Sequence, residues 1–438
     1  MIPPHPGLAQ TCRSDWSAID ASAGRYLKIR YQWKTTVGSL TDRRLIINRW
    51  NDEFKHKPAP DYYQSFGLGF YEYFQLAEDI GAAPLPIINC GMACQFNSSE
   101  LVPLDELDPY IQDALDLIEF ANGPVSSAWG RVRAGMGHPQ PFNLRMMGVG
   151  NEQWGPQFIE RYERFARVLK EKHPEVTLIS DAGPSPNDER FKFLWAKLRE
   201  LNADIVDEHY YMAPSWFLTH SDRYDNYPRT GPKVFGGEYA AQSVGIASPD
   251  NRNNWECALA EAAFMTGLDR NADVVRMASY APLFAHIDAW QWTPDLIWFD
   301  NLRSYGTPNY YVQKLFSVHK GTNILPVLLN GSTKNAQQNL YASASFDKRS
   351  SEVVLKVVNA ASSPRVARVR LDGIAAGQKI AREIVLAASD LKAENSLDQP
   401  TRISPTERRL TIPSRDFDYT FAPSSVTVLR IPVLVQFE

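Results

Sequence analysis

Between about residues 75 and 320, short apolar runs alternate with longer stretches of helical periodicity, and this alternation constrains the fold more than any other feature. Strands that alternate with helices form parallel sheets, because each helix returns the chain to the start of the next strand. The expected helices lie around and between the strands, at 70–80, 110–121, 158–171, 188–201, 255–270 and 310–319. The expected strands are residues 83–89, 144–150, 177–181, 203–209, 233–238 and 274–280. Six such units predict an α/β fold, namely most of a (β/α)8 barrel.

After residue 320 the pattern changes to the alternation with period two that is typical of strands in an all-β sandwich. We therefore expect three parts: an irregular N-terminal segment at 1–45, a catalytic barrel at 46–320 and a β-sandwich domain at 321–438. The expected sandwich strands are residues 340–346, 353–359, 366–371, 383–386, 410–412 and 426–435.

Composition excludes several kinds of partner. The net charge is −4, and neither a nucleic acid nor an anionic membrane is expected to bind a chain without a basic excess. No apolar run approaches the ~18 residues of a membrane span, and the first residues contain no visible signal peptide. Aromatic residues reach 12%, and their flat rings can stack on sugars. The four cysteines are too few for a disulfide framework in 438 residues.

The sequence Gly-Asn-Glu-Gln-Trp-Gly at 150–155 follows directly from a predicted strand. In a barrel this position is the catalytic rim, because active sites form at the carboxyl ends of the strands. Asn151 supplies a hydrogen-bonding group, Glu152 an acid and Trp154 a stacking face. The alternative interpretation is that Glu152 is a surface carboxylate at the start of a loop.

A second carboxylate, Glu238, closes another predicted strand three strands later. Two acids that meet across one barrel mouth can flank a single glycosidic bond, as glycoside hydrolysis requires. One of them must stay protonated to donate to the leaving oxygen while the other is ionised, so their surroundings must separate their pKa values. Alternatively, Glu238 caps the start of a helix.

Further polar residues lie at the ends of other predicted strands and in the loop that follows the last one. His209 and Tyr211 can hold a neighbouring carboxylate in place by hydrogen bonding, although a lone histidine is usually a structural residue. Asn89 can bind a sugar hydroxyl. In the Trp-Gln-Trp sequence at 290–292, Gln291 can reach a hydroxyl and Trp292 can wall a subsite, unless the loop merely packs against the barrel.

Two other kinds of chemistry have little support. Cys90 paired with His209 would make a cysteine nucleophile, but a free cysteine is more often a small buried apolar group. Cys90 and Cys94 are four residues apart, and no second Cys/His pair at zinc-site spacing follows. We expect no metal site and no cofactor.

The motifs resemble those of glycoside hydrolase family 51, chiefly the α-L-arabinofuranosidases of the longer bacterial and plant type. The sequence at 150–155 is similar to the family's acid/base motif, and Gly-Gly-Glu-Tyr at 236–239 is similar to its nucleophile motif. The resemblance extends from about residue 30 to the C-terminus. Its other segments are residues 69–81, 89–92, 271–284 and 290–292.

This resemblance implies a retaining enzyme that releases terminal α-L-arabinofuranosyl groups from arabinan- or arabinoxylan-type polysaccharides without a cofactor. Glu152 would be the acid/base and Glu238 the nucleophile. Asn151 would bond the sugar 2-hydroxyl, His209 and Tyr211 would orient the nucleophile, and Asn89 would line the arabinose subsite. The C-terminal sandwich would match the family's accessory β domain, and a homo-oligomer is compatible with the family.

The N-terminal part departs from the family pattern, because the first one or two barrel strands are not legible before residue 70. We therefore expect a barrel that lacks these strands, from a truncated chain whose full-length form is secreted or periplasmic. Two alternative functions follow: a catalytically impaired fragment or carbohydrate-binding protein, and an endoglucanase or β-xylosidase on the same scaffold.

Overall fold

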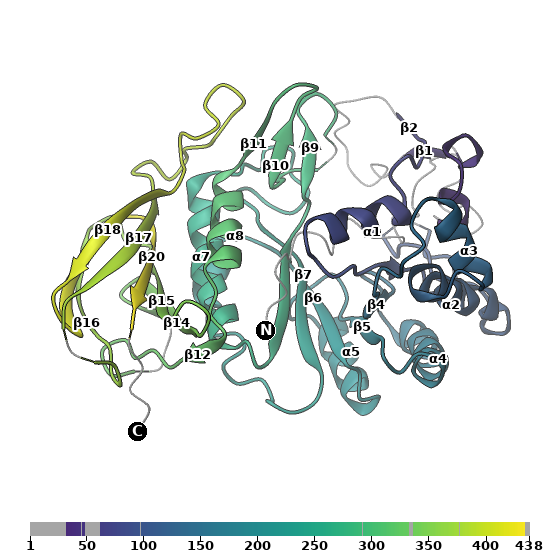
Figure 1. The fold of residues 1–438 in the computed structure, drawn as a ribbon, viewed down its shortest axis with the longest axis horizontal. Helices are drawn as coiled ribbons and strands as arrows, with labels where there is room; N and C mark the ends of the chain where they lie inside the picture. Colours follow the sequence, from purple (N-terminus) through teal and green to yellow (C-terminus); the bar gives the residue numbers. More distant parts are fainter. Residues whose placement is uncertain are drawn as a thin grey trace.

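The computed structural model of the 438-residue chain has two parts, and helices α7 and α8 stand between them (Figure 1). An α/β part lies on the right of the view and a β-rich C-terminal part on the left. The structure describes residues 32–44, 46–48, 62–96, 98–290, 292–332, 336–375 and 377–433.

A parallel sheet of six strands forms the centre of the α/β part, and its strands follow one another in chain order. All six strands predicted from the sequence are confirmed. Among the described residues, each end strand pairs with one neighbour only, so the six strands form an open arc, as predicted for a barrel without its first strands. The strands are β3 (Ile87–Ile88), β4 (Met146–Val149), β5 (Thr177–Asp181), β6 (Ile205–Met212), β7 (Lys233–Ala241) and β8 (Val275–Tyr280).

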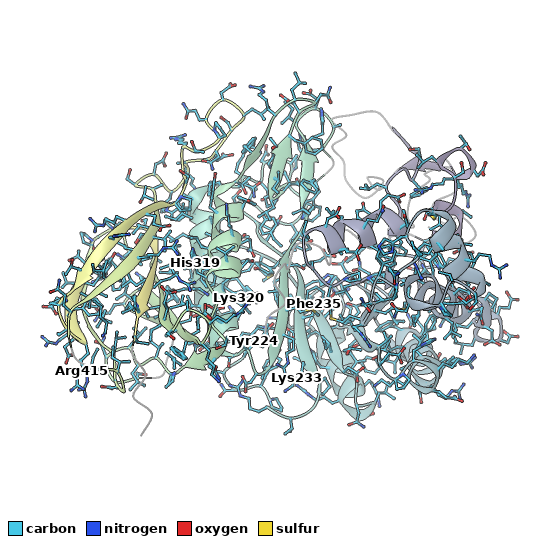
Figure 2. All side chains as sticks on the ribbon, viewed as in Figure 1. Tyr224, Lys233, Phe235, His319, Lys320 and Arg415 are labelled. Atoms are coloured by element: carbon cyan, nitrogen blue, oxygen red, sulfur yellow. The ribbon has the colours of Figure 1, made fainter. Side chains whose placement is uncertain are left out.

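Five of these strands differ from the predicted bounds, and only β5 matches them. Strand β3 is shorter than 83–89, because Pro84 and Pro86 have no N–H to give to the ladder. Strands β6 and β7 continue three residues beyond 209 and 238, so His209 and Glu238 are paired with each other inside the sheet. Below His209 and Glu238, the sheet contributes a cluster of buried apolar side chains that includes Phe235, which Figure 2 labels. The site therefore lies next to a packed apolar layer.

Helices cover the sheet, and the six predicted from the sequence are confirmed. Side chains cap several of them: Asp188 accepts from Phe191 N–H and Asn254 from Cys257 N–H at the first turns of α5 and α7. The predicted helices are α1 (Phe70–Asp79), α2 (Asp108–Asn122), α4 (Pro156–Lys172), α5 (Glu189–Glu200), α7 (Trp255–Arg270) and α8 (Pro308–Val318). The sequence reading missed α3 (Ala128–Gly135) and α6 (Pro214–Thr219), which are short.

The C-terminal part is a β-rich domain, as predicted, with a seven-stranded antiparallel sheet and a two-stranded sheet that enclose their own apolar core. The prediction missed β12, β13 and β19, which are short or lie at an edge, and residues 434 and 435 of its last strand lie outside the described residues. The strands are β12 (Asn323–Leu325), β13 (Ala336–Gln337), β14 (Leu340–Asp347), β15 (Glu352–Asn359), β16 (Arg365–Arg370), β17 (Lys379–Ala387), β18 (Thr406–Ile412), β19 (Asp416–Phe421) and β20 (Ser425–Pro432).

Helix α7 joins the two parts. Residues 257–268 are all buried, because β7 and β8 cover one side of the helix and β14 and β15 cover the other. An ion pair crosses the junction, with the buried Lys356 ammonium 2.6 Å from an Asp269 carboxylate oxygen. The Trp255 indole N–H also donates to the Ser424 carbonyl. The C-terminal domain therefore forms part of the wall behind the parallel sheet.

Smaller elements lie at the edges of the α/β part. Strands β9 (Phe284–His286), β10 (Ile297–Phe299) and β11 (Ser304–Gly306) form a small sheet after β8, at the top of Figure 1. Strands β1 (Ile46–Asn48) and β2 (Tyr62–Gln64) form an antiparallel pair. Most of the predicted N-terminal segment lies outside the described residues. Within the described ranges, no helix is both long and apolar enough to cross a membrane.

Candidate active site

Glu152 lies in the turn that follows β4, and the backbone there is unusual. Gly150 has φ +78°, and a side chain at this position would meet the Phe158 ring at 2.8 Å. Glu152 itself has φ +53°, a left-handed conformation that non-glycine residues rarely adopt. The Asp181 carboxylate accepts the N–H of the next residue, Gln153, and so holds the turn from β5. Such strain is typical of functional positions.

Glu238 lies on β7 at a β-bulge. Strand β6 pairs regularly with β7 up to Asp207, the register then shifts, and His209 pairs with Glu238. The Tyr211 hydroxyl donates a hydrogen bond to one Glu238 carboxylate oxygen. The Glu238 side chain is only 7% exposed. This carboxylate is therefore held in a fixed orientation by the neighbouring strand.

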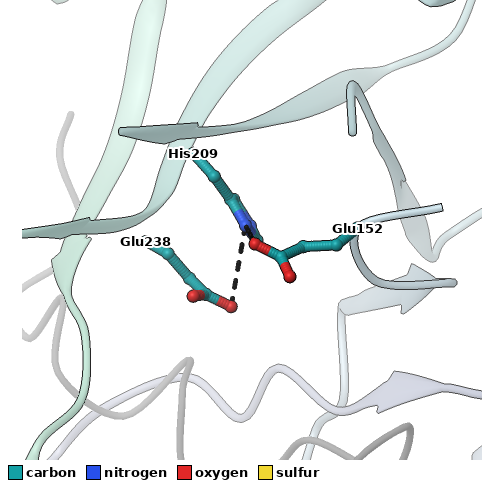
Figure 3. Close-up of side chains that lie close together, drawn as sticks. All are labelled: Glu152, His209 and Glu238. Carbon is teal, nitrogen blue, oxygen red and sulfur yellow. Dashed lines mark hydrogen bonds and ion pairs between the residues drawn. The ribbon is translucent and has the colours of Figure 1, made fainter. Parts of the chain in front are cut away.

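His209 stands between the two glutamates (Figure 3). Its Nδ1 lies 2.9 Å from a Glu152 oxygen and 3.7 Å from a Glu238 oxygen. One oxygen of each carboxylate and a ring nitrogen all lie within 4.8 Å of one another. The expectation from the family was that His209 and Tyr211 both orient the nucleophile, Glu238. In the structure Tyr211 contacts Glu238, whereas His209 is closer to Glu152.

Burial and charge act in opposite directions on His209, whose side chain is completely buried. Burial alone would lower its pKa, but the carboxylates of Asp207 and Glu152 outweigh burial and raise the pKa to about 10. Both neighbouring carboxylates therefore favour the charged form of the ring.

Two buried acids behind the site were not predicted as functional residues. Asp181 and Asp207 lie opposite each other on β5 and β6. Burial above all raises the pKa of Asp181 to about 8. Asp207 accepts a hydrogen bond from Gly237 N–H and lies 3.4 Å from His209 Nε2. Their positions at or near the ends of predicted strands were the signal that could have revealed them.

The other predicted site residues differ in how freely they can meet a ligand. The Asn151 side-chain oxygen is buried and has no hydrogen-bond partner among the described residues, so it can accept from a ligand hydroxyl. Asn89 instead braces its own loop, because its amide donates to the Met92 carbonyl and accepts from Gly91 N–H. Trp292 packs edge-on against the Tyr211 ring at 5.2 Å. Gln291 lies outside the described residues.

A rim of aromatic and amide groups adjoins Glu152. The Gln95 amide bonds both the N–H and the carbonyl of Trp154, which joins the loop after β3 to the loop after β4. The exposed Phe96 ring lies 5.2 Å from the Trp154 ring. The Arg190 guanidinium lies over the Trp154 ring, 4.7 Å from its centroid. Sequence reasoning missed Gln95, Phe96 and Arg190, because none follows directly from a predicted strand.

Glu152, His209 and Glu238 are also the residues within the described ranges that lie close enough together to share a metal ion. A cation there would have to displace the ring proton that faces Glu152. The raised pKa of His209 opposes that loss. Cys90 and Cys94 are not part of this group. The geometry therefore favours acid/base chemistry over metal binding.

Comparison with known proteins identifies the family. An α-L-arabinofuranosidase 1 domain matches residues 21–229, and an α-L-arabinofuranosidase C-terminal domain matches residues 237–425. A solved structure of the arabinose-bound α-L-arabinofuranosidase MgGH51 matches 97% of this chain at 30% identity with a TM-score of 0.81. The chain belongs to glycoside hydrolase family 51. The resemblance read from its motifs is confirmed.

Two curated relatives are longer than this chain. It is 47% identical to an extracellular exo-α-L-arabinofuranosidase of Streptomyces chartreusis over 74% of its own length and 38% of the relative's. It is 34% identical to α-L-arabinofuranosidase 2 of Arabidopsis thaliana over 92% of its length and 56% of the relative's. The chain thus spans about half the length of the curated relatives it matches, and 65% of the MgGH51 chain.

Proposed function

We propose that this family 51 protein is a retaining glycoside hydrolase that releases terminal α-L-arabinofuranosyl groups from arabinan- or arabinoxylan-type polysaccharides. The observation that carries the proposal is the pair of glutamates with oxygens within 4.8 Å of each other. Retaining enzymes have carboxyl groups about 5 to 5.5 Å apart, whereas inverting enzymes need about 6.5 to 9.5 Å to admit a water molecule.

The two glutamates have separate tasks in the proposed reaction. In the first step a Glu238 oxygen attacks the anomeric carbon, the glycosidic bond breaks, and Glu152 gives its proton to the leaving oxygen. In the second step ionised Glu152 takes a proton from water, whose oxygen attacks the same carbon and releases Glu238 from the ester. Two inversions at one carbon return the original configuration.

The surrounding residues support these assignments. Tyr211 donates to Glu238 and so favours its ionised form. The unsatisfied oxygen of Asn151 is available for the sugar 2-hydroxyl, and Trp292 lies beside Tyr211 as a wall of the subsite. We propose that Asn89 contributes mainly by holding its loop. The relatives are named for arabinofuranoside cleavage, which favours that substrate over xylosides or glucans.

The proposed division of the chain assigns these tasks to the barrel at 46–320, with the sandwich at 321–438 as its structural support through α7. No chemistry of the reaction calls for a metal or cofactor. The substrate is the one partner that the site chemistry implies.

The deciding experiment is hydrolysis of an aryl α-L-arabinofuranoside by the purified chain, with aryl β-xyloside and β-glucan as comparison substrates. We expect arabinose released first as the α-anomer, which proton NMR detects. Glu152→Ala and Glu238→Ala should each abolish most activity, whereas Glu189→Ala, at a carboxylate that is 89% exposed on α5, should not. Azide should restore turnover to Glu152→Ala. A first product in the β-configuration, or full activity in either variant, contradicts the proposal.

A further inference from the structure

Asp207 is a buried carboxylate on β6 whose two oxygens face different parts of the site. One oxygen accepts a 2.8 Å hydrogen bond from Gly237 N–H. Gly237 lies in the bulge where β7 has one residue more than β6, directly before Glu238. A side chain at residue 237 would collide with the Asp207 carboxylate. Asp207 and a glycine together therefore shape the bulge that aims Glu238.

The other Asp207 oxygen faces the histidine. Asp207 lies two residues before His209 on β6, so both side chains point to one face of the sheet. The oxygen is 3.4 Å from His209 Nε2, while Nδ1 on the other side of the ring is 2.9 Å from Glu152. Both ring nitrogens thus face carboxylate oxygens.

When Asp207 and Glu152 are both ionised, this arrangement suits the doubly protonated ring. A neutral imidazole has one N–H and one lone pair, and the lone pair would then face a negatively charged oxygen in either tautomer. The other carboxyl groups around the ring are Asp181 on β5 and Glu238 on β7. Asp181 has a raised pKa of about 8 because it is buried, so it is mostly neutral in the acid and neutral range. Asp207 is therefore the charge behind the ring.

We propose that Asp207 is a positioning residue that holds His209 as an imidazolium between Glu152 and Glu238. The fixed positive charge offsets the repulsion between two carboxyl groups that lie within 4.8 Å and must exchange roles as acid, base and nucleophile. The catalytic part of this inference rests on the proposed function. The protonation part concerns the protein alone and can be tested separately.

The protonation of His209 can be measured directly by ¹⁵N NMR on protein labelled at its eight histidines. A His209→Gln variant assigns the signal. In the unmodified protein we expect the imidazolium signal to persist at pH 8. In Asp207→Asn, which keeps an oxygen to accept from Gly237 N–H, the signal should titrate below pH 8. A neutral His209 at pH 8 in the unmodified protein overturns the inference, whether or not any variant folds.

The catalytic consequence appears in the pH profile of kcat/KM on an aryl α-L-arabinofuranoside. Above the pH at which His209 loses its proton in Asp207→Asn, the positive charge is absent and Glu152 holds its proton more tightly, so the basic limb of the profile should move upward by about one pH unit. Glu261→Gln is the control, since it alters another fully buried acid, which accepts from Ala241 N–H and Asn309 and lies on α7 rather than beside the ring. Its limbs should stay in place at whatever rate it shows.

These outcomes separate the two proposals. Absence of hydrolysis by the unmodified chain contradicts the proposed function and leaves the NMR result to decide the state of His209. Hydrolysis with a basic limb that stays in place in Asp207→Asn overturns the catalytic part of the inference, because a purely structural aspartate would lower the rate without moving that limb.

Discussion

Replacing Tyr211 by phenylalanine removes one hydroxyl from the site and leaves the ring in place, because the ring still packs against Trp292. That hydroxyl donates to Glu238, whose side chain is 7% exposed, so little water can replace it. A hydrogen bond to a charged group stabilises a protein by about 1.5–3 kcal/mol. Since about 1.4 kcal/mol corresponds to one pH unit, the ionised form of Glu238 should require a pH about 1 to 2 units higher.

The acid limb of kcat/KM for an aryl α-L-arabinofuranoside is the measurement that tests this. The attacking glutamate must be ionised, so Tyr211→Phe should move the acid limb upward by about 1 to 2 pH units. On the pH plateau above the acid limb, kcat/KM should fall less than it does within the limb. The reason is that the hydrogen bond lost in Tyr211→Phe already weakens as Glu238 gives up its charge in the transition state. An acid limb unmoved by the substitution refutes the reasoning.

A matched control lies in the C-terminal domain. The Tyr419 hydroxyl donates to Glu383 at 2.6 Å, which is the same chemical pair outside the parallel sheet. Tyr419→Phe should leave both limbs of the profile in place. If it moved the acid limb as far as Tyr211→Phe does, the shift could not be assigned to the contact with Glu238.

Three further predictions concern the metal question and stability. Dialysis against EDTA should leave kcat/KM unchanged, because His209 presents protons rather than lone pairs to its neighbours; loss of activity that zinc restores would contradict this. Lys356→Ala should destabilise the protein by about 3 kcal/mol in urea unfolding, since it leaves the Asp269 charge at the junction of the domains without its ion-pair partner and with only the Ser343 hydroxyl donating to it among the described residues. Adding Asp269→Asn should recover part of that loss, and an additive double variant would disprove the coupling. Burial raises the pKa of Glu261 from 4.5 to about 8, so the protein holds an extra proton there and loses stability as the pH rises through that range. Glu261→Gln should flatten the fall in unfolding free energy between those pH values, and an unchanged slope would show that Glu261 is not its source.

Most of the barrel could be predicted because its periodicity is local. A short segment with an apolar centre, such as 177–181 with Leu178 and Ile179, signals a buried strand wherever it lies, and β5 begins and ends at those residues. The misses follow from chain chemistry or from length. The prolines at 84 and 86 shortened β3, and short elements such as α3 carry too few turns to show a period.

The candidate site was predictable only in part. Glu152 lies directly after β4, whereas Glu238 and Tyr211 lie within β7 and β6, and the Tyr211 hydroxyl and a Glu152 oxygen both lie close to Glu238. Position along β6 does not say which of two carboxylates a ring will approach, and His209 Nδ1 lies 2.9 Å from a Glu152 oxygen and 3.7 Å from a Glu238 oxygen. Asp207 belongs to the motif at 207–211, yet its contact with Gly237 exists only because of a bulge on the adjacent strand.

The order of strands and helices and the β-rich C-terminal domain could be predicted from the sequence, because these features depend on neighbouring residues. The two carboxylates could be predicted because parallel strands end at a shared edge of the sheet. The protonation of His209 could not be read in this way. It depends on Asp207 on β6 and on Glu152 in the turn after β4, and on the exclusion of water by packing between segments far apart in the chain. Distances of a few ångströms set those charges, and only the folded arrangement creates them.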